Sequence, residues 1–556
     1  MNRRTLLQAF PALVALSEMS LGQQTQPAPP PQRITKDVLK QALQLVGLEF
    51  TDAQLDMMLP GVNRSLVSYE ALRKFSVPLD TEPAIAFRPL LPGGTLPTGK
   101  PKWQPTRFRP LTKWGKLDEL AFLPATELGA LVKAKKITST ELTKMYVERL
   151  KTYSPKLNCM ITLTEDLALE QAAKASAEIR RGKHRGPLHG IPYGAKDLFN
   201  TKGIKTTWGA EPYMDQVPEY NATVIDKLEK HGSVLVAKLS MGALAQGGLW
   251  FGGMTKTPWD YEQTSSGSSA GSASATSAGL VGFSLGTETL GSIVTPSTRC
   301  GVTGLRPTYG RASRYGAMAL SWTMDKIGPI CRSAEDCAEV LRVIAGPDGH
   351  DITTPDVPLH WQPRLPLSAL KIGYAKDEFD KQEGEPKTNY DAALEALRKA
   401  GAQLMPMKLP DFNVAAIRPI LVAEAATAFD DLTRDKGIEK LKGQAPSDWP
   451  NTFRTARTQT AVEYIRAQRV RTLLMREMDA LMKTWDVLVT PSFSPALTIT
   501  NLTGHPQVVV PCGFVKTLPM SIVFTGRLYE EGTPLRAAHA FQQATEWHKK
   551  HPTLQA

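Results

Sequence analysis

The segment from Ser265 to Thr308 reads SSGSSAGSASATSAGLVGFSLGTETLGSIVTPSTRCGVTGLRPT. Its first part consists almost entirely of glycine, alanine and serine, whose small side chains allow backbones to approach one another closely. An apolar run from Leu280 to Leu285 follows with the character of a strand, and a tight turn then presents Ser292. A flexible linker shares the small residues but is not interrupted by apolar runs of this kind. The segment therefore predicts a closely packed region that holds a serine in a turn.

This segment closely resembles the amidase signature family. The family pattern runs roughly G-G-S-S-G-G-S, then G-T-D-x-G-G-S-I-R-x-P, then C-G-x-x-G-x-K-P-T, and each part has a counterpart here. The resemblance extends from about Phe122 to about Pro552 and includes GIPYGAKD at residues 190–197. It implies an α/β fold in which a large, twisted, mixed β-sheet is sandwiched by helices. It also implies an amidase, a hydrolase that converts a carboxylic amide into an acid plus ammonia or an amine through an acyl-serine intermediate.

The hydrophobic pattern of the chain favours the same fold class. Short apolar runs of strand length alternate with helical patterns, which is typical of proteins in which helices cover a buried, largely parallel or mixed sheet. The predicted helices include one that starts at the capping sequence Thr138–Glu141, one at Leu167–Arg181 and one at Asp391–Lys399. The strand-like runs are Val234–Ala237, Lys371–Tyr374, Val487–Val489 and Val508–Val510.

The N-terminus has the layout of a secretory signal. Arg3 and Arg4 precede an apolar region that continues to about Leu21, and small residues then lead into a polar stretch. The arginine pair resembles the twin-arginine export signal, and a chance pair in an ordinary secretory signal is the alternative. We therefore predict a signal peptide at 1–22, a disordered Pro/Gln-rich tether at 23–34, and an exported protein that is periplasmic or extracellular.

A helical extension with a proline-rich connection is predicted at 35–116, before the amidase signature domain at 117–556. Apolar residues follow helical spacing from Val38, and the capping box Thr51–Gln54 opens a second helix that we expect to end before Pro60. The proline-rich connection is expected to wind over the surface. We interpret the extension as a packed addition to the main domain, with a docking element as the alternative.

Composition narrows the partners and cofactors. The chain has 556 residues and a formal net charge of +12, but no Lys/Arg block or basic stripe with aromatic residues, so no nucleic-acid partner is expected. Its five cysteines are scattered, which gives no disulfide framework and no zinc spacing. No apolar run is long enough for a membrane span, and no motif indicates a cofactor or a metal. The expected partner is a small-molecule or peptide amide, and a homo-oligomer is compatible with the sequence.

Lys196 is the candidate base. The residues before it, Leu188–Ala195, are mostly small and apolar, so its ammonium is expected to be poorly solvated. Desolvation favours the neutral amine, which can accept a proton. The resemblance implies that Ser292 is the nucleophile, that Ser268 is a bridging serine after a cis peptide bond, and that Lys196 activates the pair through Ser268. A serine hydroxyl is a weak nucleophile and must lose its proton as it attacks.

The backbone N–H groups of four consecutive residues are the candidate oxyanion hole, which stabilises the negative charge that develops on the substrate oxygen. These residues are Thr289, Leu290, Gly291 and Ser292. The resemblance has an exception here, because Leu290 stands where the family usually has glycine. A positive φ at a leucine would strain the turn, so we expect an ordinary conformation in which its side chain narrows the acyl side of the pocket.

Two further departures flank this turn: Val294 replaces the usual arginine, and Glu288 replaces the usual aspartate. They are expected to be coupled, since losing the cation removes a partner for the acid. A catalytically weak family member that acts as a binding protein is therefore one alternative function. Another is the glutamine-hydrolysing component of a tRNA-dependent amidotransferase, its A subunit, which the export signal and the N-terminal extension argue against.

A different serine hydrolase is a further alternative. Gly267–Gly271 matches G-x-S-x-G with Ser269 at its centre, which would imply the nucleophile elbow of an α/β-hydrolase. That motif requires a strand directly before the serine, and Pro258–Thr264 lacks a strand pattern. Under the amidase interpretation, His189 and His505 are structural.

The segment Phe412–Tyr464 is the part of the domain least similar to the family, and we expect it to shape the entrance of the site. Its apolar residues favour a hydrophobic acyl or amine group, but helix packing explains them equally well. These residues are Ile417, Ile420, Leu421 and Val422.

Overall fold

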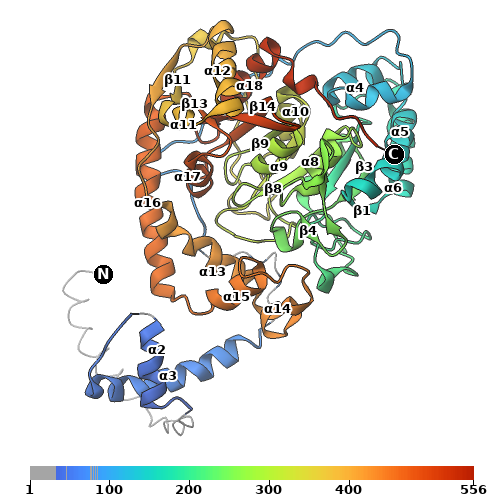
Figure 1. Ribbon diagram of the computed structural model, residues 1–556. Coiled ribbons are helices and arrows are strands. Elements are labelled where there is room, and N and C mark those ends of the chain that lie inside the picture. Colours follow the sequence, from blue (N-terminus) through green and yellow to red (C-terminus); the bar gives the residue numbers. More distant parts are fainter. Residues whose placement is uncertain are drawn as a thin grey trace, which may run out of the picture. The chain divides into compact units, whose positions relative to one another are not determined.

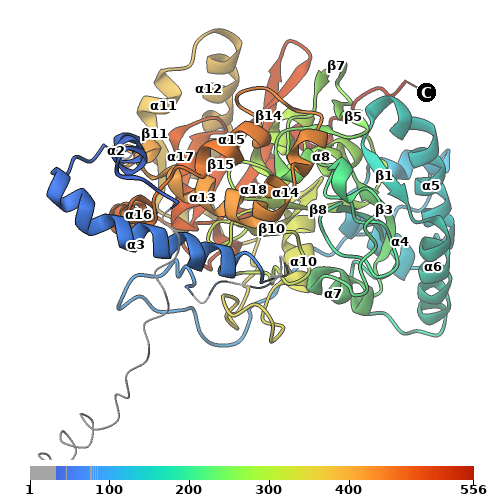
Figure 2. The same ribbon diagram turned by 90° about the horizontal axis from the view of Figure 1, so that it is seen from below.

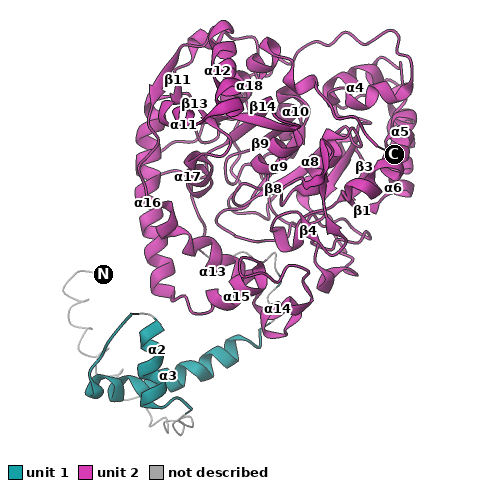
Figure 3. Ribbon diagram, viewed as in Figure 1, with its two compact units in different colours: residues 1–78 teal, residues 79–556 magenta. Residues whose placement is uncertain are grey.

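The computed structural model describes residues 33–45, 47–75, 78, 81, 83 and 85–555 (Figure 1). The chain divides into two compact units, residues 1–78 and residues 79–556, and each is described by itself (Figure 3). The signal peptide and nearly all of the tether that the sequence predicts at 1–34 lie outside the described residues.

The first unit contains two described helices, α2 (Lys36–Leu45) and α3 (Asp52–Leu72), which pack against one another. The predicted capping box begins α3. The Gln54 backbone N–H donates to the Thr51 hydroxyl, and the Gln54 side chain accepts from the Thr51 N–H at 2.8 Å. The start of this helix is therefore confirmed.

The expectation that this helix ends before Pro60 is wrong, because α3 continues through Pro60 to Leu72. A proline removes one backbone donor, which leaves the carbonyl of Asp56, one turn earlier, without its helical partner. Asp56 and Pro60 are both exposed, so water can hydrate that carbonyl and the helix tolerates the proline.

The second unit is built around an 11-stranded mixed sheet with the order β1-β3-β2-β8-β10-β9-β14-β15-β13-β11-β12. β2 is parallel to both of its neighbours, and so is β11, whereas the other pairs are antiparallel. The strands are β1 (Met160–Leu163), β2 (Pro192–Lys196), β3 (Val234–Leu239), β8 (Phe283–Glu288), β9 (Thr303–Arg306), β10 (Lys326–Cys331), β11 (Ile372–Ala375), β12 (Leu404–Met407), β13 (Val487–Pro491), β14 (Gln507–Val515) and β15 (Leu518–Gly526). Two hairpins, β4 (Leu249–Trp250) with β5 (Gly253–Met254) and β6 (Lys256–Thr257) with β7 (Asp260–Thr264), lie outside it.

The helices of this unit are α4 (Ala125–Lys133), α5 (Ser139–Leu157), α6 (Glu165–Arg180), α7 (Thr223–His231), α8 (Ala270–Ser277), α9 (Val294–Cys300), α10 (Ala334–Ile344), α11 (Lys376–Asp380), α12 (Gly384–Lys399), α13 (Pro419–Ala428), α14 (Asp430–Arg434), α15 (Trp449–Ala456), α16 (Ala461–Thr484), α17 (Pro495–Thr503) and α18 (Gly532–Ala544). They cover both faces of the sheet (Figure 2). In β10, Ile330 packs with Ala273 of α8, while the adjacent Cys331 packs in the core with residues of α10 and α18. Successive strand side chains point to opposite faces, so α8 lies on one side and α10 and α18 lie on the other. The predicted α/β fold with a large mixed sheet between helices is confirmed.

Most elements that the sequence predicts in this unit are present. The four strand-like runs lie in β3, β11, β13 and β14, and the three helical patterns lie in α5, α6 and α12. The capping box at Thr138 and Glu141 begins α5, whose buried face includes Leu142, Tyr146 and Leu150.

The Gly/Ala/Ser-rich segment forms α8, and all eight of its residues are buried. Small side chains let this helix lie close to β2, β3 and β8. Its hydroxyls are satisfied by nearby backbone: Ser272 donates to the Leu285 carbonyl at 2.9 Å, and Ser274 donates to the Lys256 carbonyl at 2.7 Å. The closely packed region is confirmed as a helix, and the strand after it begins at Phe283 rather than at Leu280.

The proline-rich connection is part of the second unit, so the division at 78/79 falls earlier than the 116/117 boundary that the sequence suggests. The physical reason is specific anchoring to the main domain. Trp103 Nε1 donates to Glu339 of α10 at 3.2 Å, and the Lys102 N–H donates to His360 Nδ1 at 3.0 Å. None of the described helices combines the length and apolar character needed to cross a membrane.

Candidate active site

Two parallel neighbouring strands, β2 and β8, end side by side at the candidate site. Ala195 of β2 lies opposite Leu285 of β8, so Lys196, the last residue of β2, emerges at the same sheet edge as the end of β8. Ser268 and Ser269 reach this edge because α8 begins directly after them. Three segments that are distant in sequence therefore meet at one point.

Lys196 is fully buried, and its Nζ lies within hydrogen-bond distance of three hydroxyl oxygens. These are Ser268 Oγ at 2.8 Å, Thr287 Oγ1 at 2.9 Å and Ser269 Oγ at 3.2 Å. Burial lowers the pKa of Lys196 to about 7, although the charges of Asp325 and Glu288 oppose the shift. Near neutral pH a large share of this side chain is therefore the neutral amine, which is the form that a base requires.

The neighbouring acidic residue, Asp197, pairs with a different lysine. Its carboxylate forms an ion pair with Lys238 Nζ at 3.1 Å, and both side chains are fully buried. It also accepts hydrogen bonds from the N–H and the hydroxyl of Thr207, at 2.7 and 2.5 Å. Asp197 is thus part of a separate buried ion pair and leaves Lys196 to its three hydroxyl partners.

Ser268 follows a cis peptide bond from Gly267. Glycine is required at 267, because an added Cβ would lie 1.8 Å from the Gly247 carbonyl oxygen. The next residue, Ser269, fastens this segment to its surroundings. Its hydroxyl donates to the carbonyl of Thr287, near the end of β8, at 3.0 Å, and its N–H donates to the Ser292 carbonyl at 3.2 Å. Ser268 is therefore held between the end of β8 and the turn that carries Ser292.

Ser292 lies in the turn between β8 and α9 and is 8% exposed. The preceding Gly291 has a φ of +88°, which glycine adopts without a steric penalty. Within the described residues, the backbone N–H groups of 289–292 form no hydrogen bond, so they are available to an oxyanion. The structure brings Lys196 and Ser268 into contact, whereas the described contacts include no hydrogen bond between the hydroxyls of Ser268 and Ser292.

Glu288 keeps a cationic partner although Val294 replaces the usual arginine. Its Oε1 pairs with Arg306 at 2.8 Å, and its Oε2 accepts the N–H groups of Ile293 and Val294 at 2.8 and 2.9 Å. Burial alone would raise the pKa of Glu288, but Arg306 and these hydrogen bonds outweigh burial and hold it below its usual value. The expectation that the acid loses its partner is therefore wrong, because Arg306 of β9 supplies the charge.

A cavity of about 40 Å³ opens beside Thr287 and Thr289. Its walls come mainly from the loop between β9 and β10 and from the loop after α10. The lining residues are Leu198, Ala245, Thr287, Thr289, Arg314, Tyr315, Ala317, Met318, Ala319, Leu320, Trp322, Asp325, Ile327, His350 and Asp351. Thr287 is a partner of Lys196 and Thr289 begins the candidate oxyanion turn, so the cavity adjoins the candidate catalytic groups.

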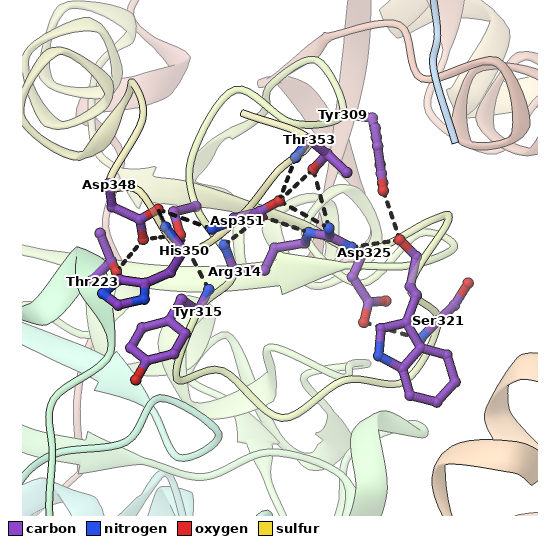
Figure 4. Close-up of polar contacts among 12 residues, drawn as sticks. Thr223, Tyr309, Arg314, Tyr315, Ser321, Asp325, Asp348, His350, Asp351 and Thr353 are labelled. Carbon is purple, nitrogen blue, oxygen red and sulfur yellow. Dashed lines mark hydrogen bonds and ion pairs between the residues drawn. The ribbon is translucent and has the colours of Figure 1, made fainter. Parts of the chain in front are cut away.

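Hydrogen bonds and an ion pair hold the two loops together (Figure 4). The guanidinium of Arg314 pairs with Asp351 at 3.1 Å and donates to the Trp322 carbonyl at 2.5 Å. It also donates to Thr353 at 3.1 Å. On the other side, the rings of Tyr315 and His350 are stacked with their centroids 4.1 Å apart.

Asp325 connects this cavity to the turn of Ser292. It accepts hydrogen bonds from the Thr289 hydroxyl at 2.6 Å and from the N–H groups of Leu320 and Ser321 at 2.8 and 3.0 Å. Burial raises the pKa of Asp325, although these hydrogen bonds oppose the shift.

Leu290 has an ordinary φ, as expected, so its backbone is not strained. Its side chain is 39% exposed and is not among the residues that line the cavity. The structure therefore gives no support to the expectation that Leu290 narrows the acyl side of the pocket.

The segment Phe412–Tyr464 also contributes no lining residue to this cavity. Ile417 and Ile420 are fully buried in a hydrophobic cluster, which is the helix-packing role that the sequence left open. One residue of the segment, Glu424 of α13, contacts the loop that lines the cavity. Its carboxylate accepts the Ser321 hydroxyl at 2.6 Å and the Thr323 N–H at 3.0 Å, on either side of Trp322.

The expectation that residues 258–264 lack a strand is wrong, because Asp260–Thr264 forms β7. This strand is half-exposed and polar, which removes the apolar run that would have revealed it. Among the described strands it pairs with β6 alone, in a hairpin, and it ends before Ser265, so it does not lead directly into Ser269. The hydroxyl of Ser269 is buried between Lys196 and β8, which is not the exposed position of a nucleophile elbow.

The two histidines that the sequence assigns to structural roles have partners outside the site. His189 Nε2 lies 3.2 Å from Glu178, and His505 Nδ1 shares a hydrogen bond of 2.8 Å with Thr503. Burial lowers the pKa of His189 to about 4, so this side chain is neutral at ordinary pH.

Sequence reasoning missed Thr287 and Asp325 as site residues. Thr287 stands inside the quoted signature, and its place at the end of a strand beside β2 was the available signal. Asp325 had no such signal, because its contact with Thr289 depends on how the long loop before β10 folds back.

The amidase family model matches residues 141–503. The A subunit of the glutamyl-tRNA(Gln) amidotransferase from Moorella thermoacetica is 34% identical over 484 residues, which cover 78% of this chain and 99% of that protein. The corresponding protein of Carboxydothermus hydrogenoformans is 33% identical over 488 residues, covering 78% of this chain and 100% of that protein.

Solved structures of an amidase and of an amidotransferase A subunit are also similar to this chain. The native peptide amidase of Stenotrophomonas maltophilia superposes with a TM-score of 0.70 and 29% identity, covering 77% of this chain and 98% of that chain. The A subunit of the glutamyl-tRNA(Gln) amidotransferase from Thermotoga maritima gives a TM-score of 0.65 and 27% identity, covering 76% of this chain and 95% of that chain.

Proposed function

The chain belongs to the amidase family, and from this membership we propose that it hydrolyses a carboxylic amide through an acyl intermediate on Ser292. It is a hydrolase that acts on carbon–nitrogen amide bonds, and its substrate is a small-molecule or peptide amide. The observation that carries the proposal is the buried contact of 2.8 Å between Lys196 Nζ and the Ser268 hydroxyl. A buried lysine whose pKa is about 7 can remove a proton that an ordinary lysine cannot.

The reaction begins with two proton transfers. Neutral Lys196 accepts a proton from Ser268 while Ser268 takes the proton of Ser292, and Ser292 Oγ bonds to the amide carbon. The carbonyl oxygen becomes an oxyanion that accepts hydrogen bonds from the turn 289–292. The C–N bond then breaks, and the proton returns through Ser268 to the leaving nitrogen, so ammonia or an amine departs. Water attacks the acyl-enzyme by the same proton route and releases the acid.

A serine-reactive fluorophosphonate tests this proposal directly. The full chain should gain one covalent adduct, which peptide mass spectrometry locates on Ser292, and Ser292→Ala should gain none. The same purified protein should release ammonia or amine from a panel of short, aryl, peptide and fatty amides. An unlabelled Ser292 together with no release from any amide would instead favour a catalytically weak member that acts as a binding protein.

A second candidate function is supported by the names of the relatives. The chain spans 99% of the A subunit of a glutamyl-tRNA(Gln) amidotransferase at 34% identity. On this alternative the substrate is glutamine, and the ammonia goes to a partner protein. Stable co-purification of the chain with other amidotransferase components would support it, whereas a chain that is active alone on other amides supports the amidase.

We also propose that the protein is exported to the periplasm or the extracellular space. The support is the sequence of residues 1–22, with Arg3 and Arg4 before an apolar region. An exported location argues against the amidotransferase alternative, because tRNA charging takes place in the cytosol.

A further inference from the structure

We propose that the cavity beside Thr287 and Thr289 receives a short, uncharged, apolar acyl group, and that Trp322 sets its depth. This inference rests on the proposed function, because it assigns the substrate class of the same site. It separates neutral aliphatic amides from glutamine, whose acyl part carries an ammonium and a carboxylate.

The apolar, buried part of the lining, here called the floor, consists of Leu198, Leu320 and Ile327, which are between 1% and 3% exposed. Trp322 also lines the cavity and is partly buried. Removing apolar surface from water is the main source of affinity in such a site. A side chain that reaches this floor therefore gains free energy only if it is apolar.

The charged groups that line the cavity are already engaged. Arg314 pairs with Asp351, and the Arg314 guanidinium also donates to the Trp322 carbonyl. Asp325 accepts three hydrogen bonds, and His350 is stacked on Tyr315. A carboxylate entering this cavity would lose its water, while Arg314, the cationic side chain of the lining, is already paired with Asp351, which makes entry costly.

The cavity suits the acyl side of the amide better than the amine side. The acyl group stays bonded to Ser292 through both steps of the reaction, whereas the amine must leave before water enters. A space whose floor is buried is not an exit route. It can, however, retain a group that remains attached beside Thr289 at the start of the oxyanion turn.

Hydrogen bonds anchor the backbone on both sides of Trp322. The Asp325 and Glu424 carboxylates hold Ser321 and Thr323, the residues before and after it. The Trp322 carbonyl accepts from Arg314 at 2.5 Å and from the hydroxyl of Tyr309 at 2.6 Å. A side chain on so well-anchored a backbone cannot retreat easily, so it imposes a sharp limit on size.

The free volume of about 40 Å³ indicates what that limit is. This volume is far below the roughly 300–1,000 Å³ of pockets that hold drug-sized ligands, which favours a short group. Short acyl groups such as propionyl or butyryl are therefore expected to fit, and longer chains are expected to meet the indole of Trp322.

The test compares full-length wild type, Trp322→Ala and Trp547→Ala across unbranched primary amides from acetamide to octanamide. Trp547 is a matched control, because it is partly buried and does not line the cavity. Wild type and the control should prefer short chains, and Trp322→Ala should raise kcat/KM for octanamide by about tenfold or more. L-Glutamine should be at least about a hundredfold poorer than butyramide in wild type. An unchanged chain-length profile in soluble, folded Trp322→Ala, or glutamine hydrolysed as well as butyramide, overturns the proposal.

A second readout separates the failure of this inference from the failure of the proposed function. Alkyl fluorophosphonates of increasing chain length should label Ser292 at rates that follow the same profile, with longer chains gaining in Trp322→Ala. If Ser292 is labelled but the profile does not respond to Trp322→Ala, only the inference fails. If wild type is neither labelled nor active, the proposed function fails and the inference fails with it. Trp322→Phe provides an intermediate size if the alanine variant does not fold.

Discussion

The Asp325 carboxylate accepts a hydrogen bond from the Thr289 hydroxyl at 2.6 Å, so one side chain joins the cavity wall to the candidate oxyanion turn. The same carboxylate holds the backbone of Leu320 and Ser321. Its charge also raises the pKa of Lys196, against the larger effect of burial. Asp325 therefore influences both the position of the wall and the protonation of the base.

This arrangement predicts a pH dependence with a defined sign. Protonated Lys196 cannot accept a proton, so kcat/KM of wild type should fall as the pH drops through about 7. Asp325→Asn removes a negative charge that favours the ammonium form, so the pKa of Lys196 should fall and the acid limb should move to lower pH. The measurement is kcat/KM against pH for both proteins, with Asp391→Asn on the exposed face of α12 as the control. An acid limb that stays in place or moves to higher pH contradicts the assignment.

The three candidate catalytic side chains predict graded losses. Ser292→Ala should abolish amide hydrolysis, because no other group can form the acyl bond. Ser268→Ala and Lys196→Ala should each lower kcat by orders of magnitude, since each interrupts the proton route. Circular dichroism and thermal melting should show that the variants remain folded. Full activity of Ser292→Ala would end the mechanism.

Glu288 predicts a loss of stability that a second substitution partly reverses. Glu288→Gln leaves the Arg306 guanidinium buried without its counter-charge, which costs about 3–5 kcal/mol in comparable pairs. Adding Arg306→Met to Glu288→Gln removes the uncompensated charge and should recover part of the loss in Tm. Each variant is followed by calorimetry. Equal Tm values for Glu288→Gln and wild type would show that the ion pair has no such role.

Leu290→Gly should leave the chain-length profile of amide hydrolysis unchanged, because the leucine side chain is exposed and lies outside the cavity lining. The sequence alone predicts the opposite, a gain on larger acyl groups. Glycine raises the entropy of the unfolded chain, so stability should fall by about 0.4–1 kcal/mol. Measuring kcat/KM over the amide series and the Tm of both proteins distinguishes the two outcomes. A selective gain on long acyl amides would restore the steric account.

If the protein uses the twin-arginine route, its export should depend on the two arginines themselves and not only on their positive charge. Replacing both Arg3 and Arg4 by lysine should stop secretion if the twin-arginine route is used, since that route reads the arginines themselves. Fractionation of the producing cells and an immunoblot measure the exported share. Unchanged export of the double variant would point to the general secretory pathway.

The contact between Lys196 and Ser268 is implied by the resemblance to the amidase signature family, because both residues lie in motifs of that family. The strand-like runs and the start of α5 follow from periodicity and capping. Errors occur where the outcome depends on solvent or on distant residues. Helix α3 passes Pro60 because the freed carbonyl is exposed, and Glu288 stays paired because Arg306 arrives from another strand.

The cavity shows the limit of sequence reasoning most clearly. Its walls are irregular loops that carry no periodic pattern, and their shape depends on carboxylates such as Asp325 and Glu424 that bind backbone groups far away in the chain. Neither residue stands in a pattern that predicts such a role. The candidate reacting groups could therefore be proposed from the sequence, whereas the residues that shape the pocket could not.

Glu424 lies in a different part of the chain from the residues proposed to react, so the selectivity and the reactivity of the site are encoded in separate segments. It supports the wall at Ser321 and Thr323 from a segment, 412–464, that carries none of the candidate reacting groups. Mutation or recombination within that segment can reshape the pocket without touching the machinery that breaks the bond. A lineage under selection for new amides can therefore diversify there while Lys196 and Ser268 stay unchanged, and libraries for directed evolution are best confined to the same stretch.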